Sequence, residues 1–504
     1  MIGLAIMVAA AAATAIGAEA TTGGANARAA NPGRGTLHKV DQDAFPHAAC
    51  LDGSPPAFYH RPATTSGGAS KWVVFHEGGD FCGYGDTWSE WVEDCRKRSH
   101  TELGSSHSFK VNSAKDLYAS GADIFANDPS SLVYDWNWVY MLYCDGHYYA
   151  GANLSTTLAP VPASVSVPMP ADTGVNTGAD TGADTGADMG TAGVAPRTEQ
   201  LYFRGRFNLE AVLGTVGLLA TPSTSKPTPT LGTRTHTAAA DVTADVAADV
   251  TADATTDVLV HGCSSGAVAV FSNADHIRSI LPPSARVAAA ANSGYYMNTK
   301  EEYTEYWTRP PFIMANLTAT LNPACVASAA QRHTPWNCIV AEVTAPFITK
   351  LPVFAWQSRY DSNQLGCVEI DPANASAVNA YGAALEGSLL AWVQAAGPAG
   401  DGGAAGARAG VAEARGAFVD GCYSHCSCSS GIAAGDWTPR TALASWWEGL
   451  WAYEGRSAHR GGGGGGGGGK RGSTASRSRF WAQDGAYPCR TCCTSPQPAS
   501  CGPR

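Results

Sequence analysis

Short, continuous apolar runs alternate along this chain with segments that have the composition of helices. Four runs have the length of strands buried on both faces of a sheet and are bounded by Gly, Asp or Pro: 72–76, 139–143, 258–260 and 353–356. Helices are indicated between them, from Leu209 onward, from Ala267 onward and over 377–396. Alternating strands and helices predict an α/β fold with a doubly wound, mostly parallel sheet. In such a sheet the chemistry lies at the carboxyl ends of the strands.

Four low-complexity stretches interrupt this pattern: 155–197, 219–256, 397–416 and 460–479. They are built mainly of Ala-Asp-Thr-Gly repeats, Thr/Ala/Pro and Ala-Asp-Val runs, Gly/Ala, and a run of nine glycines. Such segments bury too little apolar surface to offset the entropy lost on ordering, so we expect disordered surface insertions. The rest of the chain, within 36–496, is expected to form one domain.

The first 20 residues are predicted to be a secretory signal peptide. Residues 2–20 are almost wholly apolar or small, and Ala18-Glu19-Ala20 offers a small-x-small cleavage site. An uncleaved anchor helix is the alternative, although the apolar run is slightly shorter than the roughly 20 residues that span a bilayer. Fifteen cysteines and three N-glycosylation sequons agree with secretion; the sequons begin at Asn153, Asn316 and Asn374. We therefore expect an extracellular, disulfide-bonded glycoprotein with no stable membrane insertion after cleavage.

Charge and cysteine spacing argue against two classes of function. The formal net charge is −10 and no basic cluster overrides it, which argues against a nucleic-acid partner. The close-set cysteines lack the paired C-x2-C spacing of a zinc site; they are Cys422, Cys426, Cys428, Cys489, Cys492 and Cys493. Because the cysteine count is odd, at least one thiol stays unpaired, and we expect it to be Cys263, inside a tight turn.

The strongest chemical signal is the pentapeptide Gly262-Cys263-Ser264-Ser265-Gly266. It follows the apolar run 258–260 and precedes a stretch of small residues, which is the order strand, sharp turn, helix. A serine on such a turn is lifted out of the backbone with its hydroxyl exposed. The sequence therefore predicts Ser264 as the nucleophile of a serine hydrolase, with the backbone N–H of Ser265 as one oxyanion donor.

A serine nucleophile needs a base and an acid that orients the base, and in α/β-hydrolases the acid and then the base follow the serine. Asp361 comes just after the predicted strand 353–356 and is the best acid. His425 is the best base, because flanking cysteines would hold its loop in place. The alternatives are weaker: His333 precedes the acid, His459 adjoins the glycine run, and His261 is expected to lie in the strand before the elbow.

A second group of oxyanion donors should come from a glycine-rich loop after an early strand. The segment Glu77-Gly78-Gly79-Asp80-Phe81-Cys82 follows the predicted strand 72–76 and meets that need. A plain β-turn is the alternative interpretation of this segment. The chain contains the loop, the elbow, the acid and the base in the expected order. Chance explains this combination much less well than it explains any one of the four.

Six ordered segments resemble the pectin acetylesterases and their animal relative Notum, a deacylase of lipidated Wnt proteins. They are Trp72 to Cys82 with Cys95 and Arg96, Trp136-Asn137-Trp138-Val139 with Tyr143-Cys144-Asp145-Gly146, Gly262 to Ala267, Tyr360 to Leu365, Cys422 to Cys426, and Tyr487-Pro488-Cys489 to Cys493. The resemblance covers most of the chain outside the insertions. It implies an α/β-hydrolase-like fold, a hydrolase domain over 36–496, and Ser264, Asp361 and His425 as nucleophile, acid and base.

The same resemblance implies oxyanion donors at Gly79, Asp80 and Ser265. The chain departs from the family pattern here: Asp80 and Phe81 replace a glycine and a tryptophan, and Ser265 and Ala267 replace an alanine and a glycine. Neither elbow substitution removes a backbone donor. Ala267 must have a φ below zero, or the elbow is strained.

The leading hypothesis is a secreted serine carboxylic-ester hydrolase that deacetylates an acidic cell-wall polysaccharide, pectin, through an acyl-enzyme. It would act as a monomer and need no metal or organic cofactor. One alternative is Notum-like deacylation of a lipidated protein, which requires a deep apolar acyl pocket. The other is a wall protein that binds glycan without turnover, since the charge of Asp80 could disfavour an oxyanion.

Overall fold

The computed structural model describes residues 33–120, 124–160, 198–220, 256–395, 411, 414–426, 431–452, 479–489 and 492. The expected signal peptide lies outside these residues, and so does most of each expected insertion. Two insertion boundaries need correction, because strand β6 occupies Thr157–Pro160 and strand β11 begins at Gly416. No described helix combines the length and the apolar character needed to cross a bilayer.

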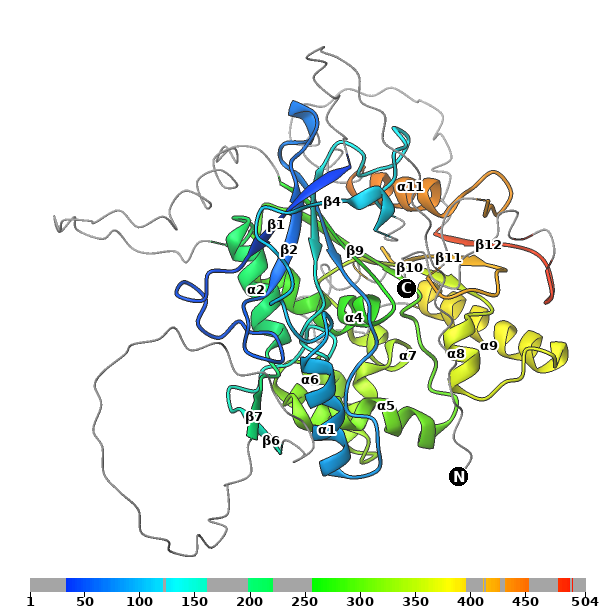
Figure 1. Ribbon diagram of the computed structural model, residues 1–504. Coiled ribbons are helices and arrows are strands. Elements are labelled where there is room, and N and C mark those ends of the chain that lie inside the picture. The colour runs from blue at the N-terminus through cyan, green and yellow to red at the C-terminus, as the bar shows by residue number, and fades with distance from the viewer. Residues whose placement is uncertain are drawn as a thin grey trace, which may run out of the picture.

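A ten-stranded open sheet forms the centre of the described chain (Figure 1). Its strand order is β12-β11-β10-β9-β8-β3-β5-β2-β1-β4. The bounds are β1 Arg34–Lys39, β2 Ala57–Arg61, β3 Lys71–His76, β4 Ala114–Asp116, β5 Asn137–Met141, β8 Asp257–Cys263, β9 Arg286–Asn292, β10 Val353–Ser358, β11 Gly416–Asp420 and β12 Phe480–Ala482. Strand β6 pairs with β7 (Thr198–Leu201) in a separate antiparallel ribbon.

The sheet is parallel from β12 through β5, and antiparallel pairs join β5 to β2, β2 to β1 and β1 to β4. The four predicted strands are confirmed as β3, β5, β8 and β10, and the mostly parallel sheet is confirmed with them. The antiparallel edge was not predicted. Strand β9 was missed as well, because its run of alanines lacks the bulky β-branched residues that mark a strand.

Helices cover both faces of the sheet. They are α1 Trp88–Ser99, α2 Gly205–Thr215, α4 Ser265–Ile280, α5 Glu301–Met314, α6 Pro323–Ala330, α7 Ala341–Thr344, α8 Ser362–Cys367, α9 Ala375–Gln394 and α11 Pro439–Trp451. Short 3-10 turns lie at Ser66–Gly68, Leu117–Ala119, Leu317–Ala319, Pro335–Ile339 and Ala345–Phe347. In Figure 1, α11 lies across the sheet from α2 and α4. The predicted helices from Leu209, from Ala267 and over 377–396 are confirmed as α2, α4 and α9.

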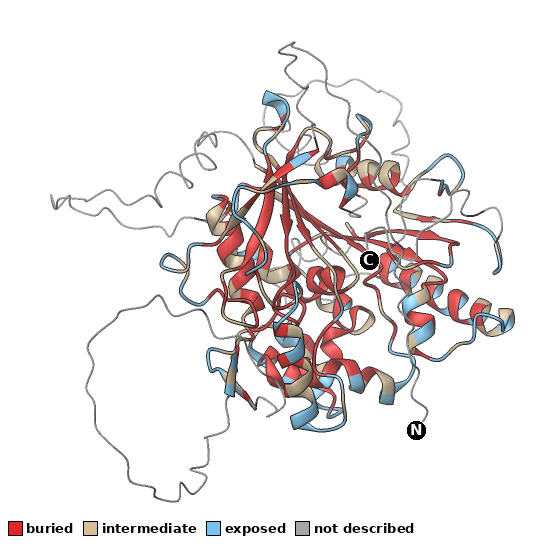
Figure 2. Ribbon diagram, in the orientation of Figure 1, coloured by how far each residue is buried: buried red, intermediate tan, exposed pale blue. Residues whose placement is uncertain are grey.

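Two apolar layers enclose the sheet, and its strands from β11 to β2 are almost wholly buried, whereas the outer strands β1, β4 and β12 are partly exposed (Figure 2). Successive side chains of a strand point to opposite faces, so Trp72 and Val74 of β3 enter one layer while Val73 and Phe75 enter the other. This double burial explains why the parallel strands are continuous apolar runs rather than alternating ones. Because β3, β8, β9, β10 and β11 are consecutive parallel neighbours, their carboxyl ends lie side by side along the carboxyl edge of the sheet.

Candidate active site

The predicted elbow is a sharp turn between β8, which ends at Cys263, and α4, which begins at Ser265. Ser264 has φ 57° and ψ −127°, a conformation in which a residue other than glycine is strained. The turn is also crowded: a Cβ on Gly262 would lie 2.3 Å from the carbonyl oxygen of Gly266, and one on Gly266 would lie 2.1 Å from that of His76. Glycine is therefore required on both sides of the serine.

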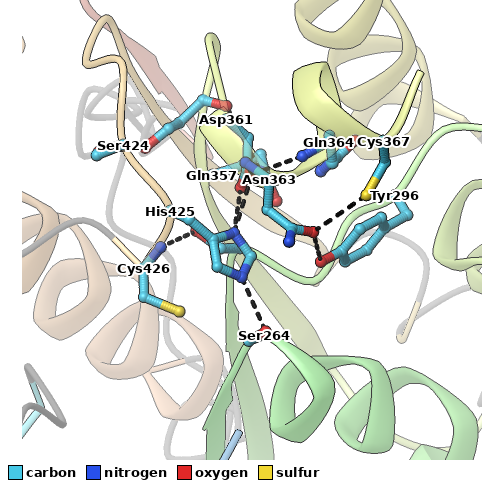
Figure 3. A network of polar contacts seen from close by, with 12 residues as sticks. Ser264, Tyr296, Gln357, Asp361, Asn363, Gln364, Cys367, Ser424, His425 and Cys426 are labelled. Carbon is cyan, nitrogen blue, oxygen red and sulfur yellow. Dashed lines mark hydrogen bonds and ion pairs between the residues drawn. The ribbon is translucent and has the colours of Figure 1, made fainter. Parts of the chain in front are cut away.

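Ser264, His425 and Asp361 are brought together at this edge (Figure 3). His425 Nε2 lies 2.8 Å from Ser264 Oγ. His425 Nδ1 lies 2.9 Å and 3.0 Å from Asp361 Oδ1 and Oδ2. Since an ionised carboxylate can only accept, Nδ1 carries the proton, and Nε2 is left to accept the serine hydroxyl proton.

Asp361 is fully buried and its two oxygens are held by three further donors. It caps the N-terminus of α8, where Oδ1 accepts the backbone N–H groups of Asn363 at 3.0 Å and Gln364 at 3.1 Å. Its Oδ2 accepts the side-chain amide of Gln357, the penultimate residue of β10, at 3.0 Å. These contacts fix the carboxylate plane that faces the imidazole.

The loop after β11 carries His425 and is attached on its far side to the elbow. The backbone N–H of Cys426 donates to Ser293 Oγ at 2.8 Å, and a disulfide joins Cys426 to Cys263. The prediction that Cys263 is the unpaired thiol is therefore wrong. The Cys263 side chain points out of the turn toward the loop that carries His425. Only the fold brings this loop close to Cys263, so the local sequence does not reveal the pairing. Among the described cysteines, the free one is Cys367.

The alternative bases do not reach Ser264 in the described structure. His261 lies in β8, where burial lowers its pKa to about 4 and its Nδ1 lies 2.8 Å from the carbonyl oxygen of Ala290. His333 is exposed in the turn between α6 and the 3-10 turn Pro335–Ile339. His459 falls outside the described residues.

The glycine-rich loop after β3 lies against the elbow. A Cβ on Gly78 would lie 3.0 Å from that of Ser264, and the backbone N–H of Gly79 donates to Ser265 Oγ at 3.2 Å. Gly79 and Asp80 have φ values of 151° and 66°. The predicted donors Gly79 and Asp80 are therefore next to Ser265, whose own backbone N–H opens α4 and has no partner within the helix.

Both oxygens of the Asp80 carboxylate bond within their own loop. Oδ1 accepts the backbone N–H of Phe81 at 3.0 Å, and Oδ2 accepts the hydroxyl of Tyr84 at 2.7 Å. Ala267, the other departure from the family pattern, lies inside α4 and has a negative φ, so the elbow tolerates it.

Two partly buried side chains anchor the loop to its surroundings. Arg98 of α1 donates to the carbonyl oxygens of Gly79 at 2.6 Å and Phe81 at 3.3 Å. Glu77 accepts the Tyr140 hydroxyl at 2.8 Å and the backbone N–H of Tyr143 at 2.9 Å, and burial raises its pKa. These contacts hold the loop in shape before any substrate binds.

Sequence reasoning missed four of the positioning residues: Gln357, Ser293, Arg98 and Glu77. Only Glu77 carried a usable signal, because it stands directly before the paired glycines. The other three act across elements that are far apart in the chain, and nothing in their local sequence marks them.

Metal-ligating residues gather at one place in the described chain, Cys82, Cys95 and His147. Cys82 and Cys95 are joined by a disulfide, so neither offers a thiolate. His147 Nε2 lies 2.9 Å from the carbonyl oxygen of Cys82, and burial lowers its pKa to about 3. This cluster does not have the donor set of a metal site.

The mostly parallel sheet, the elbow and the Ser264–His425–Asp361 arrangement define an α/β-hydrolase-like protein. The family model for Pectinacetylesterase matches residues 29–159 and 234–442, more than half of the chain. The protein therefore belongs to the pectinacetylesterase family. It is a carboxylic ester hydrolase.

Known relatives agree with this family. The chain is 24% identical over 434 residues to Pectin acetylesterase 7 of Arabidopsis thaliana, a match that covers 81% of this chain and 86% of that protein. It is 24% identical over 318 residues to Pectin acetylesterase 11 of the same organism, covering 63% and 60% of the two chains. A stretch of 118 residues is 33% identical to Palmitoleoyl-protein carboxylesterase NOTUM of Schmidtea mediterranea, covering 22% and 20%.

Among solved structures, the Wnt deacylase Notum from Drosophila matches with a TM-score of 0.53 and 18% sequence identity. The match covers 83% of this chain and 93% of that one. At this identity the similarity establishes the fold, in agreement with the predicted α/β-hydrolase-like class.

Proposed function

We propose that the protein removes acetyl groups from a cell-wall polysaccharide, pectin, with Ser264 as nucleophile, His425 as base and Asp361 as the orienting acid. The observation that carries this proposal is the continuous hydrogen-bonded chain from Ser264 Oγ through His425 to Asp361, with distances of 2.8 and 2.9 Å. Membership of the pectinacetylesterase family supports the acetyl ester as the scissile bond.

The geometry supports a two-step displacement. Ser264 Oγ attacks the acetyl carbonyl carbon while His425 Nε2 takes its proton, and the carbonyl oxygen becomes an oxyanion. The backbone N–H groups of Gly79, Asp80 and Ser265 are the proposed donors to that oxyanion. When the tetrahedral intermediate collapses, His425 returns the proton to the leaving sugar oxygen, and acetyl-Ser264 remains.

Water then completes the cycle. His425 Nε2 removes a proton from the water as its oxygen attacks the acetyl carbon of acetyl-Ser264. The second tetrahedral intermediate expels Ser264 Oγ, which regains its proton, and acetate leaves. Asp361 stabilises the imidazolium in both steps without itself taking a proton.

A short acyl group is supported by the aromatic side chains around the glycine-rich loop 77–82, the proposed oxyanion loop. Phe81 packs on Tyr84 and Tyr148, with ring centroids 4.4 Å and 6.3 Å apart, and Tyr148 packs edge-on against Trp307. Rings that pack on one another leave less room for a long chain than an open apolar channel does. Relative turnover of 4-nitrophenyl acetate and 4-nitrophenyl palmitate tests this; faster cleavage of the palmitate would favour the protein deacylase instead.

The decisive experiment measures acetate release from acetylated pectin by the wild type and by Ser264→Ala. Removal of the nucleophile is expected to lower kcat by at least about a thousandfold and to abolish labelling by a fluorophosphonate probe. Ser279→Ala is the matched control, since Ser279 Oγ is exposed and donates to the carbonyl oxygen of His276 at the far end of α4. Release that persists in Ser264→Ala would overturn the proposed nucleophile, and labelling without release from pectin would overturn the substrate.

We further infer that the enzyme is secreted, with 36–496 as one hydrolase domain that works as a monomer. Five disulfides among the described residues support an oxidising compartment. The intact mass of the secreted product, with size-exclusion chromatography coupled to light scattering, tests cleavage of the signal peptide and the oligomeric state together.

A further inference from the structure

The oxyanion loop carries a charged side chain where the family pattern has glycine. Asp80 adopts φ 66°, in the left-handed region that glycine enters freely and other residues enter at a cost. It is exposed, and its carboxylate is fixed by Phe81 N–H at 3.0 Å and the Tyr84 hydroxyl at 2.7 Å. A side chain held at a strained position beside a nucleophile is a candidate for a functional role.

The carboxylate is not neutralised by a direct ion pair within the described part of the chain. The Arg98 guanidinium reaches the same loop, but it is bound to the backbone carbonyls of Gly79 and Phe81. Cations on α5 and just before it are engaged elsewhere: Lys300 pairs with Glu369 at 3.6 Å, and Arg309 with Glu305 at 2.7 Å. Asp80 is therefore a carboxylate with no direct ion-pair partner among the described residues, although the Arg98 guanidinium is bound to the residues on either side of it.

That charge lies close to the reacting serine. Gly78 packs against Ser264 and the N–H of Gly79 reaches Ser265, so Asp80 is within two residues, about 8 Å along the backbone, of both contacts. Its electrostatic influence extends to residues near Asp361. Burial is the main cause that raises the pKa of Tyr296, and the charges of Asp361, Cys367 and Asp80 raise it further, in that order. The Tyr296 hydroxyl donates to Asn363, which lies beside the proposed acid. Burial is also the main cause that raises the pKa of Tyr84, and the charge of Asp80 is the second.

We propose that Asp80 is a specificity-determining residue that disfavours an ionised sugar carboxylate next to the scissile acetyl group. This inference rests on the proposed function and names the substrate within it: galacturonyl units whose carboxylate is masked as a methyl ester. An ionised galacturonate carries its negative charge on the same ring as its acetylated hydroxyls, so binding would place it near Asp80. Two like charges several ångström apart at a solvent-lined site lower affinity by a few-fold to about tenfold.

The test compares one acetylated, highly methyl-esterified pectin with the same polymer after a methylesterase has removed methyl groups and left the acetyl groups in place. The kcat/KM for acetate release is measured on both polymers at low salt. The wild type should favour the methyl-esterified polymer by about five- to tenfold, and Asp80→Asn should reduce that preference to less than about twofold. Asparagine tolerates a positive φ, so the variant is expected to fold.

The readout is the ratio of kcat/KM on the methyl-esterified polymer to kcat/KM on the demethylated polymer, taken for each variant separately. A substitution that changes the catalytic rate on both polymers equally leaves this ratio unchanged. Asp86→Asn is the matched control: the residue is exposed, lies six positions along the same segment, and removes the same charge. It should keep the wild-type preference. Raising the ionic strength to about 0.5 M should narrow the preference of the wild type, since the repulsion is screened.

A wild type without preference, or an Asp80→Asn variant that keeps the full preference, would overturn the role of Asp80 while leaving pectin as the substrate. Release of acetate from neither polymer, with 4-nitrophenyl acetate still cleaved, would instead reject pectin and this assignment with it.

Discussion

At the scale of single residues, the most unusual contact is between the elbow and the oxyanion loop. The family pattern has alanine where this chain has Ser265, and the Ser265 hydroxyl accepts the N–H of Gly79 at 3.2 Å. Gly79 is one of the three proposed oxyanion donors. In the free enzyme the Gly79 N–H already donates to the Ser265 hydroxyl. A developing oxyanion would therefore have to displace that hydroxyl before it could accept the N–H.

We predict that Ser265→Ala raises kcat for acetyl ester hydrolysis by about two- to tenfold. The removed hydrogen bond is worth about 0.5–1.5 kcal/mol, and the freed donor acts only on the charge of the transition state, so KM should change little. Steady-state kinetics with 4-nitrophenyl acetate measures both constants. Ser272→Ala is the control, because Ser272 is buried on the same helix and its hydroxyl has no partner among the described residues. A kcat that falls tenfold would show that the hydroxyl supports the hole instead.

At the scale of elements, helix α1 controls the shape of the oxyanion loop through Arg98. The helix begins with a complete capping box between Thr87 and Glu90, so its position is well defined relative to the loop before it. Arg98, near its end, reaches back to the carbonyls of Gly79 and Phe81.

We predict that Arg98→Ala lowers kcat about tenfold or more with little change in KM, because the loop loses two backbone contacts that aim its N–H groups. Kinetics on a soluble acetyl ester measures this, with circular dichroism to verify folding. Lys97→Ala is the control: its side chain is 69% exposed, and among the described residues its ion-pair partner is Glu93 on the same helix. An equal loss in both variants would point to a general effect on α1.

A second connection between elements is the disulfide Cys263–Cys426, which ties the end of β8 to the loop that follows β11. We predict that Cys263→Ala/Cys426→Ala lowers kcat about tenfold, since the residues next to Ser264 and His425 are no longer joined. The pair Cys325→Ala/Cys338→Ala removes a disulfide between α6 and the 3-10 turn Pro335–Ile339. It should lower the free energy of unfolding by about 2–4 kcal/mol and leave kcat unchanged. An unchanged kcat in the first pair would show that the histidine loop is held by hydrogen bonds alone.

The order of strands in the sheet explains which site residues could be predicted from the sequence and which could not. Ser264, Asp361 and the Gly78-Gly79 loop each follow directly after a buried parallel strand, and the edge of a parallel sheet brings such positions together. Gln357 and Ser293 were missed because their roles depend on which strands are neighbours, an order that local periodicity does not contain. For the same reason Cys263 was expected to be free, whereas its partner is 163 residues away.

At the scale of the whole molecule, four buried histidines set a dependence of stability on pH. Burial is the main cause that lowers their pKa values, to about 4 for His60, His76 and His261 and about 3 for His147. Each has one ring nitrogen without a partner among the described residues, as expected of a neutral imidazole. Burial acts in the opposite direction on Asp145, whose pKa rises to about 6.

The free energy of unfolding is therefore predicted to fall as the pH drops from about 6.5 toward 4. The unfolded chain binds protons on these histidines around and below their ordinary pKa of 6.5 while the folded chain does not, so each histidine costs about 1.5 kcal/mol between pH 6.5 and 5. Asp145 contributes the opposite sign, but only below about pH 6 and as one group against four. Urea unfolding at pH 7, 6 and 5 measures the slope. His261→Gln removes one of the four groups and should make the slope less steep by about a quarter, even if it lowers stability throughout. His107→Gln, at a side chain that is 78% exposed, should leave the slope unchanged. A wild-type stability that is constant or rises toward pH 5 would contradict the neutral, buried state of these four side chains.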